Sequence, residues 1–186
     1  SPAVLDRAKL DWMNGHYIRA LKTDELAERL LPFLTRAGIE ADLATMQKIA
    51  PLVQERLKRL DEIVPQARFF LEKDFQGGEY LSMGTPEEMN QTIETLRAAR
   101  KTVESYFGSS EEMERSFRMD SERLNLKSKE YFQTLRLAVT GSMVSPPLIG
   151  TIMVLGRDET LRRIDQTVDR AQALRDTAQR LRGEIS

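Results

Sequence analysis

Hydrophobic residues recur every three or four positions along most of the chain, which is the spacing of amphipathic α-helices. We expect one helix to begin at Thr23-Asp24 and another to follow a cap at Asp42. The clearest start is Thr85-Pro86-Glu87-Glu88, which combines a cap, a proline and a capping-box glutamate. No segment shows the alternation of a β-strand, so the pattern predicts an all-α chain.

Prolines and glycines are expected to divide this helical pattern. Pro51 predicts a kink or a break, after which helical spacing continues over residues 54–63 to a second break at Val64-Pro65. Residues 75–84 contain two adjacent glycines and lack helical periodicity, so we place a boundary between two helical-bundle subdomains there. A last helix, capped by Asp158, carries an apolar stripe that needs a partner. The stripe packs either on the second subdomain or against a helix of another molecule. The first alternative is favoured in a compact chain.

A stiff elbow is expected within residues 135–156. One helix ends at Thr140-Gly141, where glycine suits the left-handed position just past a helix end. Pro146 and Pro147 restrict the linker that follows, and a second apolar helix ends at Gly156. From the residues alone, the elbow is interpreted as a packing joint between two helices.

Composition narrows the class of protein. The 186 residues are 40% hydrophobic and 31% charged, with a mean hydropathy of −0.45, so a core can be buried. No apolar run approaches the ~18 residues that span a bilayer, and the start does not resemble a signal peptide. The absence of cysteine excludes disulfides and fits a reducing compartment. We therefore expect a cytoplasmic protein with no membrane partner.

Charge and candidate chemistry do not indicate an enzyme site. The net charge of −1 argues against a broad nucleic-acid-binding field, but it leaves open a small site for a few unpaired bases. Because His16 is the only histidine, neither a zinc site nor a Ser-His-Asp triad can be assembled. Trp12, the only tryptophan, is interpreted as a core anchor in preference to a base platform. We expect no catalytic and no metal-binding residue in this chain.

Three blocks of sequence are more specific than the helical pattern. The first is KLDWMN at Lys9–Asn14 with Tyr17-Ile18, the second is RLKRLDEIVPQAR at Arg56–Arg68, and the third is the elbow, LRLAVTGS followed by SPPL and LG. In this order they resemble the C-terminal anticodon-binding region of bacterial glutamyl-tRNA synthetases. Lys127-Ser128-Lys129 is faintly similar to the catalytic loop of class I synthetases, but it lies downstream of the first block and is assigned no role.

The resemblance implies an all-α cage of two subdomains, residues 23–76 and 77–186, preceded by the tail of a stem-contacting domain at residues 1–22. The chain is then the non-catalytic part of a glutamate–tRNA ligase, without a cofactor of its own, since ATP and Mg²⁺ belong to the absent catalytic domain. The implied partners are the anticodon loop of glutamate tRNA and the enzyme's own N-terminal catalytic domain, with the protein a monomer. Composition alone favours the alternative, a helical structural or protein-interaction module without RNA binding.

Five residues match the positions that bind the anticodon in that family. They are Arg56, Arg136, Ser145, Pro146 and Leu148. By resemblance, the last four are expected to face the first two anticodon bases. The position after Leu148 is often aromatic in the family, whereas here it is Ile149. For Leu148 the alternative is simple core packing.

Arg56 is implied by the resemblance to mark a discriminating enzyme, one that accepts glutamate tRNA and refuses glutamine tRNA. These tRNAs differ at the third anticodon base, which is C in one and G in the other. Arginine carries only hydrogen-bond donors, which suit the acceptors of cytosine and oppose the donors of guanine. From the residues alone, Arg56 is instead an exposed helix arginine paired with Asp61, Glu62 or another acid.

Overall fold

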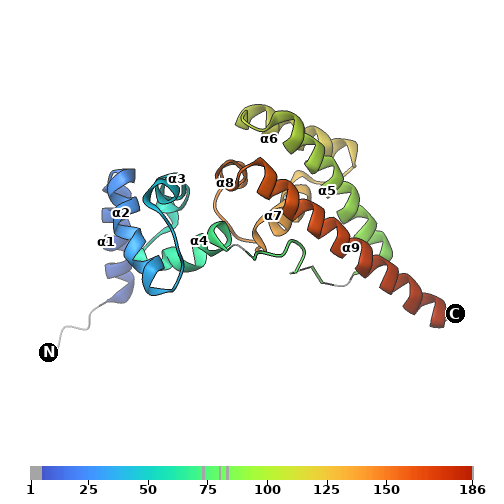
Figure 1. Cartoon of the computed structure of the whole chain (residues 1–186), viewed down its shortest axis with the longest axis horizontal. Coiled ribbons are helices and arrows are strands. Elements are labelled where there is room, and N and C mark those ends of the chain that lie inside the picture. The colour runs from blue at the N-terminus through green and yellow to red at the C-terminus, as the bar shows by residue number, and fades with distance from the viewer. Residues whose placement is uncertain (1–5, 73, 80, 83, 186) are drawn as a thin grey trace. The chain divides into compact units, whose positions relative to one another are not determined.

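The computed structural model describes residues 6–72, 74–79, 81–82 and 84–185. Within these ranges the regular elements are helices and none is a strand, which confirms the predicted all-α class (Figure 1). The chain divides into two compact units, residues 1–73 and 74–186. Every described helix is too short or too polar to span a membrane.

The first unit has four α-helices and two short 3-10 helices among its described residues. They are α1 (Arg7–Ala20), α2 (Thr23–Arg36), α3 (Leu43–Val53), η1 (Gln54–Arg56), η2 (Leu60–Glu62) and α4 (Ile63–Leu71). The Asp42 carboxylate caps α3 by accepting from the Thr45 amide at 2.6 Å, as predicted. Helices α2 and α3 pack against each other. The core side chains that they bury include Leu26, Leu30, Leu34, Met46 and Ile49.

Residues 54–63 do not form the continuous helical stretch that the sequence predicts. Residues 57–59 leave the helix between η1 and η2. The Glu62 carboxylate accepts hydrogen bonds from the amides of Lys58, at 2.8 Å, and Arg59, at 3.3 Å. The Glu62 side chain therefore satisfies two backbone amides that would otherwise need helical hydrogen bonds. The chain can leave the helix there without unsatisfied donors.

The two prolines that were expected to interrupt helices behave differently. Helix α3 passes through Pro51 but ends at Val53, which agrees with the predicted kink or break. The expected break at Val64-Pro65 is wrong, because α4 begins at Ile63 and includes both residues. Pro65 lies in the first turn of α4, where an N–H group has no intrahelical acceptor and its loss costs little.

Trp12 is not a core anchor, since 67% of it is exposed. Helix α1 runs through Gly15 and buries Gly15 and Ile18, whereas Trp12 lies nearer the start of the helix, where no residue is buried. The side-chain amide of Gln54 donates to the carbonyls of Ile18 and Leu21, at 3.0 and 2.9 Å. These bonds satisfy carbonyls at the end of α1 and attach this helix to the first unit.

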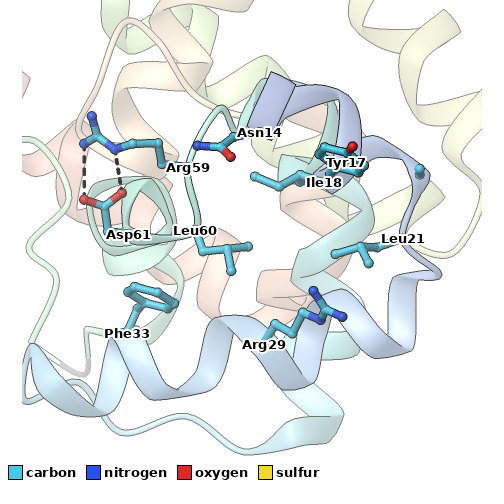
Figure 2. Close-up of a pocket in the computed structure, with 10 residues that line it drawn as sticks. Asn14, Tyr17, Ile18, Leu21, Arg29, Phe33, Arg59, Leu60 and Asp61 are labelled. Atoms are coloured by element: carbon cyan, nitrogen blue, oxygen red, sulfur yellow. Dashed lines mark hydrogen bonds and ion pairs between the residues drawn. The ribbon is translucent and has the colours of Figure 1, made fainter. Parts of the chain in front are cut away.

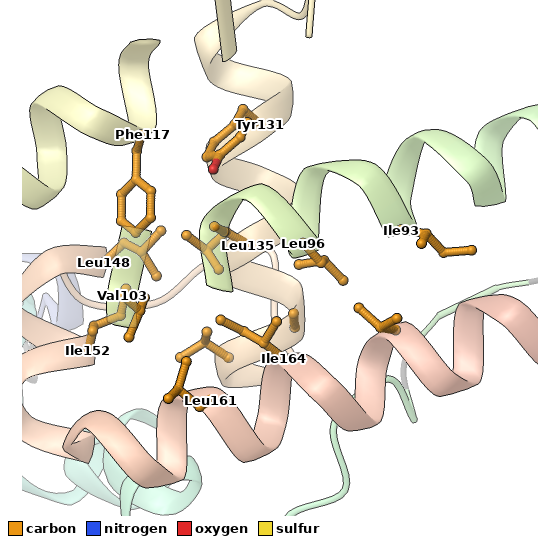
Figure 3. Packing of buried hydrophobic residues seen from close by; sticks show 14 of the residues in the cluster. Ile93, Leu96, Val103, Phe117, Tyr131, Leu135, Leu148, Ile152, Leu161 and Ile164 are labelled. Carbon is orange, nitrogen blue, oxygen red and sulfur yellow. The ribbon is translucent and has the colours of Figure 1, made fainter. Parts of the chain in front are cut away.

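The second unit is built from five helices among its described residues. They are α5 (Pro86–Tyr106), α6 (Ser110–Arg123), α7 (Ser128–Thr140), α8 (Leu148–Leu155) and α9 (Arg157–Ile185). Helices α5 and α9 pack side by side (Figure 1). All five helices contribute to one hydrophobic cluster, in which Leu135 of α7 lies near Leu96 of α5 and Ile164 of α9 (Figure 3). The apolar stripe of α9 thus packs within this unit.

The glycine-rich segment before α5 packs against α9. The amide of Gly77 donates to the side-chain oxygen of Gln166 at 2.9 Å. Phe75 is buried, and the guanidinium carbon of Arg163 lies 3.9 Å from the centroid of its ring. A Cβ atom on Gly77 would lie 2.1 Å from the Arg163 carbonyl oxygen, so only glycine fits at this approach. The described part of this segment therefore belongs to the second unit.

Candidate functional site

The elbow between α7 and α8 is held by Arg136. Helix α7 ends at Gly141, which has the predicted left-handed conformation with φ +67° and donates to the Leu137 carbonyl at 2.8 Å. Nη1 of Arg136 donates to the carbonyls of Ser145, at 3.1 Å, and Pro146, at 2.9 Å. The same nitrogen also donates to the Ser145 hydroxyl. One guanidinium on α7 therefore fixes the path of the linker that follows it.

Three of the predicted site residues lie beneath the surface of the elbow. Ser145, Pro146 and Leu148 are buried, and Arg136 is half-buried. Leu148 belongs to the hydrophobic cluster, which agrees with the packing alternative for this residue. The residues at the elbow surface are different ones, because Pro147 is exposed and Ile149 is half-exposed.

A cavity of about 460 Å³ lies beside the elbow. Arg136, Pro147, Leu148 and Ile149 line it from the elbow side. Its other walls come from α6 and the start of α7, and they hold two cations, one acid, a hydroxyl and an aromatic ring. These residues are Arg118, Lys129, Glu114, Ser128 and Phe132. With three cations to one acid, the cavity suits a ligand that carries negative charge or hydrogen-bond acceptors.

The sequence did not identify Arg118, Lys129 or Phe132 as site residues. Lys129 lies in the tripeptide that was assigned no role, and Arg118 lies on a separate helix. Phe132 and Arg136 are four residues apart on α7, so they share one face of the helix. That spacing is the one signal in the sequence that could have added Phe132 to the site.

A buried arginine supports the elbow from α9. Arg163 is fully buried, and its Nη1 donates to the Val139 carbonyl near the end of α7 at 2.7 Å. Its Nε donates to Glu159 at 2.6 Å. Burial alone would raise the pKa of Glu159, but hydrogen bonds from Arg162 and Arg163 outweigh it and hold this pKa below its usual value. Arg163 therefore ties the last turn of α7 to the first turns of α9.

Arg56 lies in the first unit, at the end of η1, and is exposed. In the same segment Leu57 and Ile63 are fully buried, whereas Leu60 is only partly buried. Asp61, one of the acids considered as its partner, forms two hydrogen bonds with Arg59, at 2.9 and 3.1 Å. The hydrogen bond from Arg59 lowers the pKa of Asp61.

A second cavity, of about 610 Å³, adjoins this segment in the first unit (Figure 2). Tyr17 and Ile18 of α1 line one side, and Arg29 and Phe33 of α2 line another. The Arg59–Asp61 pair closes a third side. The walls are mostly apolar, so this cavity suits the flat face of a ring better than a phosphate group. Among the described residues, no cluster of three or more histidines or carboxylates could hold a metal ion.

Comparisons with known proteins give consistent results. The family described as "Anticodon binding domain" matches residues 25–168. The glutamate–tRNA ligase of Roseiflexus sp. (strain RS-1) is 36% identical over 172 residues, which are 89% of this chain and 34% of that protein. The corresponding ligase of Chloroflexus aurantiacus is 35% identical over 174 residues, 88% of this chain and 35% of that protein. This chain thus spans about a third of the length of these relatives.

A solved structure shares the fold. The crystal structure of a glutamate tRNA ligase from Elizabethkingia meningosepticum superposes with a TM-score of 0.67 at 21% sequence identity. The superposition covers 86% of this chain and 31% of the other. It shows that the arrangement of helices described above also occurs in that protein.

Proposed function

The chain belongs to the anticodon-binding domain family, and from this membership we propose that it binds the anticodon loop of glutamate tRNA as part of a glutamate–tRNA ligase. The observation that carries the proposal is the extent of the family match, which includes both Arg56 and the whole elbow. The match favours RNA binding over the alternative of a structural helical module.

The elbow cavity suits unpaired bases. Bases of an anticodon loop can be splayed out of their stack and bound one at a time by side chains. Arg118, Lys129 and Arg136 provide donors, and the elbow is already fixed by hydrogen bonds before RNA arrives. A preorganised site loses less conformational entropy on binding. In this proposal Ser145, Pro146 and Leu148 act mainly by shaping the wall that the first two bases meet.

Arg56 is proposed to contact the third anticodon base from the first unit. It is exposed at the end of a short helix whose neighbours Leu57 and Ile63 are buried, so its backbone is well anchored. A guanidinium can donate to the O2 and N3 acceptors of cytosine, whereas guanine presents donors on most of the same edge. The parent enzyme would then be the discriminating type.

The remaining assignments extend this proposal to the whole enzyme. Residues 1–22 would be the end of a stem-contacting domain, and residues 23–76 and 77–186 the two anticodon-binding subdomains. The catalytic part, which would use ATP and Mg²⁺, lies outside this chain, so the chain alone should not charge tRNA. We place the enzyme in the cytoplasm as a monomer in which this region works with its own catalytic domain.

Binding of a glutamate tRNA transcript tests the proposal. The chain should bind this transcript at least tenfold more tightly than an unrelated tRNA of the same length, measured by filter binding. Arg136→Ala should weaken binding about tenfold or more, because the variant loses a donor and the bonds that fix the elbow. Its far-UV spectrum should stay helical.

Arg180→Ala, on an exposed turn of α9, is the matched control and should bind like the wild type. Equal affinity of the wild type for both RNAs would contradict the proposed function. Unchanged binding by Arg136→Ala would contradict only the role of the elbow.

A further inference from the structure

Phe132 is more exposed than the aromatic residues that it contacts. Phe117 and Tyr131 are fully buried, and each has its ring centroid 6.0 Å from that of Phe132. The Phe132 ring is nearly perpendicular to Phe117, with an angle of 88°, and is tilted by 67° to Tyr131. Phe132 itself is only partly buried and lines the elbow cavity. Its ring is therefore held in place from behind while part of it borders open space.

Arg118 lies over this ring. The guanidinium carbon of Arg118 is 5.7 Å from the centroid of Phe132, and Nη2 of Arg118 pairs with Glu114 at 2.6 Å. The side chains of Arg118 and Glu114 are 56% and 47% exposed, and an exposed pair of this kind is weak. Arg118 can therefore leave its present position at little cost in free energy.

We propose that Phe132 and Arg118 form a stacking subsite for one unpaired nucleobase, a subsite that rests on the proposed function. The base would lie flat on the Phe132 ring, with Arg118 over its other face. Stacked layers lie about 3.5 Å apart, so a base between ring and guanidinium needs about 7 Å. The guanidinium carbon of Arg118 now lies 5.7 Å from the ring centroid, so Arg118 must move outward to admit a base.

The position of Arg136 completes the subsite. Arg136 follows Phe132 by one turn of α7 and lines the same cavity. A base stacked on Phe132 would therefore lie in the same cavity as this hydrogen-bond donor. Ile149, on the elbow side of the cavity, offers no ring. Among the described residues that line this cavity, Phe132 is thus the one that offers an aromatic ring.

The experiment uses the 186-residue chain and glutamate tRNA transcripts that carry 2-aminopurine at a single position of the anticodon. Stacking on an aromatic ring quenches this base, so one position should lose fluorescence when the wild type binds. Phe132→Leu should remove that quenching and weaken binding roughly fivefold to a hundredfold, the range for loss of one base–aromatic stack. Phe132→Tyr should retain both properties. Arg118→Gln, at an exposed position, should weaken binding severalfold without loss of helicity.

Phe107→Leu is the matched control, because Phe107 also packs partly buried against the same hydrophobic cluster but does not line the cavity. It should bind and quench like the wild type. If the wild type binds the transcript but Phe132→Leu and Arg118→Gln bind and quench equally well, the stacking subsite is wrong and the proposed function survives. If the wild type shows no preference for the glutamate transcript, both are overturned.

Discussion

Arg136 and Arg163 both hold the backbone of the elbow. Arg136 donates forward, to the carbonyls of Ser145 and Pro146, whereas Arg163 donates from α9 to the Val139 carbonyl. Arg163 satisfies a carbonyl that helix geometry leaves without a partner in the last turn of α7, and Arg136 satisfies two carbonyls of the linker. Two charged side chains thus set the backbone of a segment that carries little regular structure. The elbow therefore depends in part on Arg163, which does not itself line the cavity.

At the same scale, Arg56 should determine the choice of the third anticodon base. We expect the wild type to prefer a glutamate tRNA transcript with C at that position over one with G by tenfold to a hundredfold, since an arginine–base contact discriminates by ~1–3 kcal/mol. Arg56→Gln should reduce the preference to a few-fold, because an amide can donate and accept and so tolerates both bases.

Lys58→Gln is the control for this prediction. Lys58 is an exposed cation in the same segment, so its loss should affect both transcripts alike. Filter binding of the two transcripts measures the ratio directly. If the wild type binds C and G transcripts equally, Arg56 does not read this base, and the interpretation as an exposed structural arginine stands.

At the scale of elements, helices with local start and stop signals could be predicted from the sequence. Thr85 and Glu88 form the expected capping box, with bonds of 3.1 and 2.7 Å, and Gly141 closes α7 as predicted. Residues 54–63 could not be predicted, because the contact that bends them comes from the Glu62 side chain reaching back to two amides. Helical periodicity alone does not reveal such a contact.

The site could be predicted only in part, for a related reason. The linear motif points to Arg136 and the elbow, but the opposite wall of the cavity comes from α6, which only tertiary packing brings near. Trp12 shows the same limit. Its size suggests a core position, yet α1 buries Gly15 and Ile18 and leaves Trp12, nearer its start, exposed.

Gly77 provides a test of how closely its segment packs on α9. Gly77→Ala would place a Cβ atom 2.1 Å from the Arg163 carbonyl and 2.9 Å from the Thr167 hydroxyl oxygen. The backbone must then shift away from α9, and we expect a loss of about 1–3 kcal/mol in the free energy of unfolding, as for other overpacked sites. Urea denaturation followed by circular dichroism measures this change.

The same substitution at Gly183 is the control. Nothing lies within 4 Å of a Cβ there, and the residue is in α9, so alanine should be neutral or stabilise by up to about 1 kcal/mol. Equal stability of Gly77→Ala and the wild type would mean that the segment does not lie against α9 as described.

At the scale of the whole molecule, each unit has its own core and its own candidate contact with RNA. Arg56 belongs to the first unit, and the elbow cavity to the second. The net charge of −1 provides no general attraction for phosphates. In the proposed function, affinity for RNA then comes from a small number of specific contacts, as expected for recognition of unpaired bases rather than of a long duplex.

The stability of the whole chain should fall at acid pH. Folding lowers the pKa of several carboxyl groups through hydrogen bonds from backbone amides or arginine side chains. They include Asp42, Asp61, Glu87 and Glu159. Below about pH 4 the unfolded chain takes up protons that the folded chain resists. The contribution of these groups to stability is therefore complete above their ordinary pKa values of 3.8 and 4.5, and it is lost as the pH falls.

At alkaline pH the stability of the chain should fall as the pH rises, and Tyr131 is the group responsible for this loss. Burial and the nearby Asp120 carboxylate raise the pKa of Tyr131 well above its ordinary value of 10.0, so folding favours the neutral phenol. Above about pH 10 the unfolded chain loses this proton while the folded chain retains it, and stability falls.

Urea midpoints at about pH 3.5, 7 and 10.5 should show a maximum at the middle value. Glu159→Gln should reduce the loss of stability at acid pH. Tyr131→Phe should reduce the loss of stability at alkaline pH. A Tyr131→Phe variant with the same alkaline loss as the wild type would show that another group controls it.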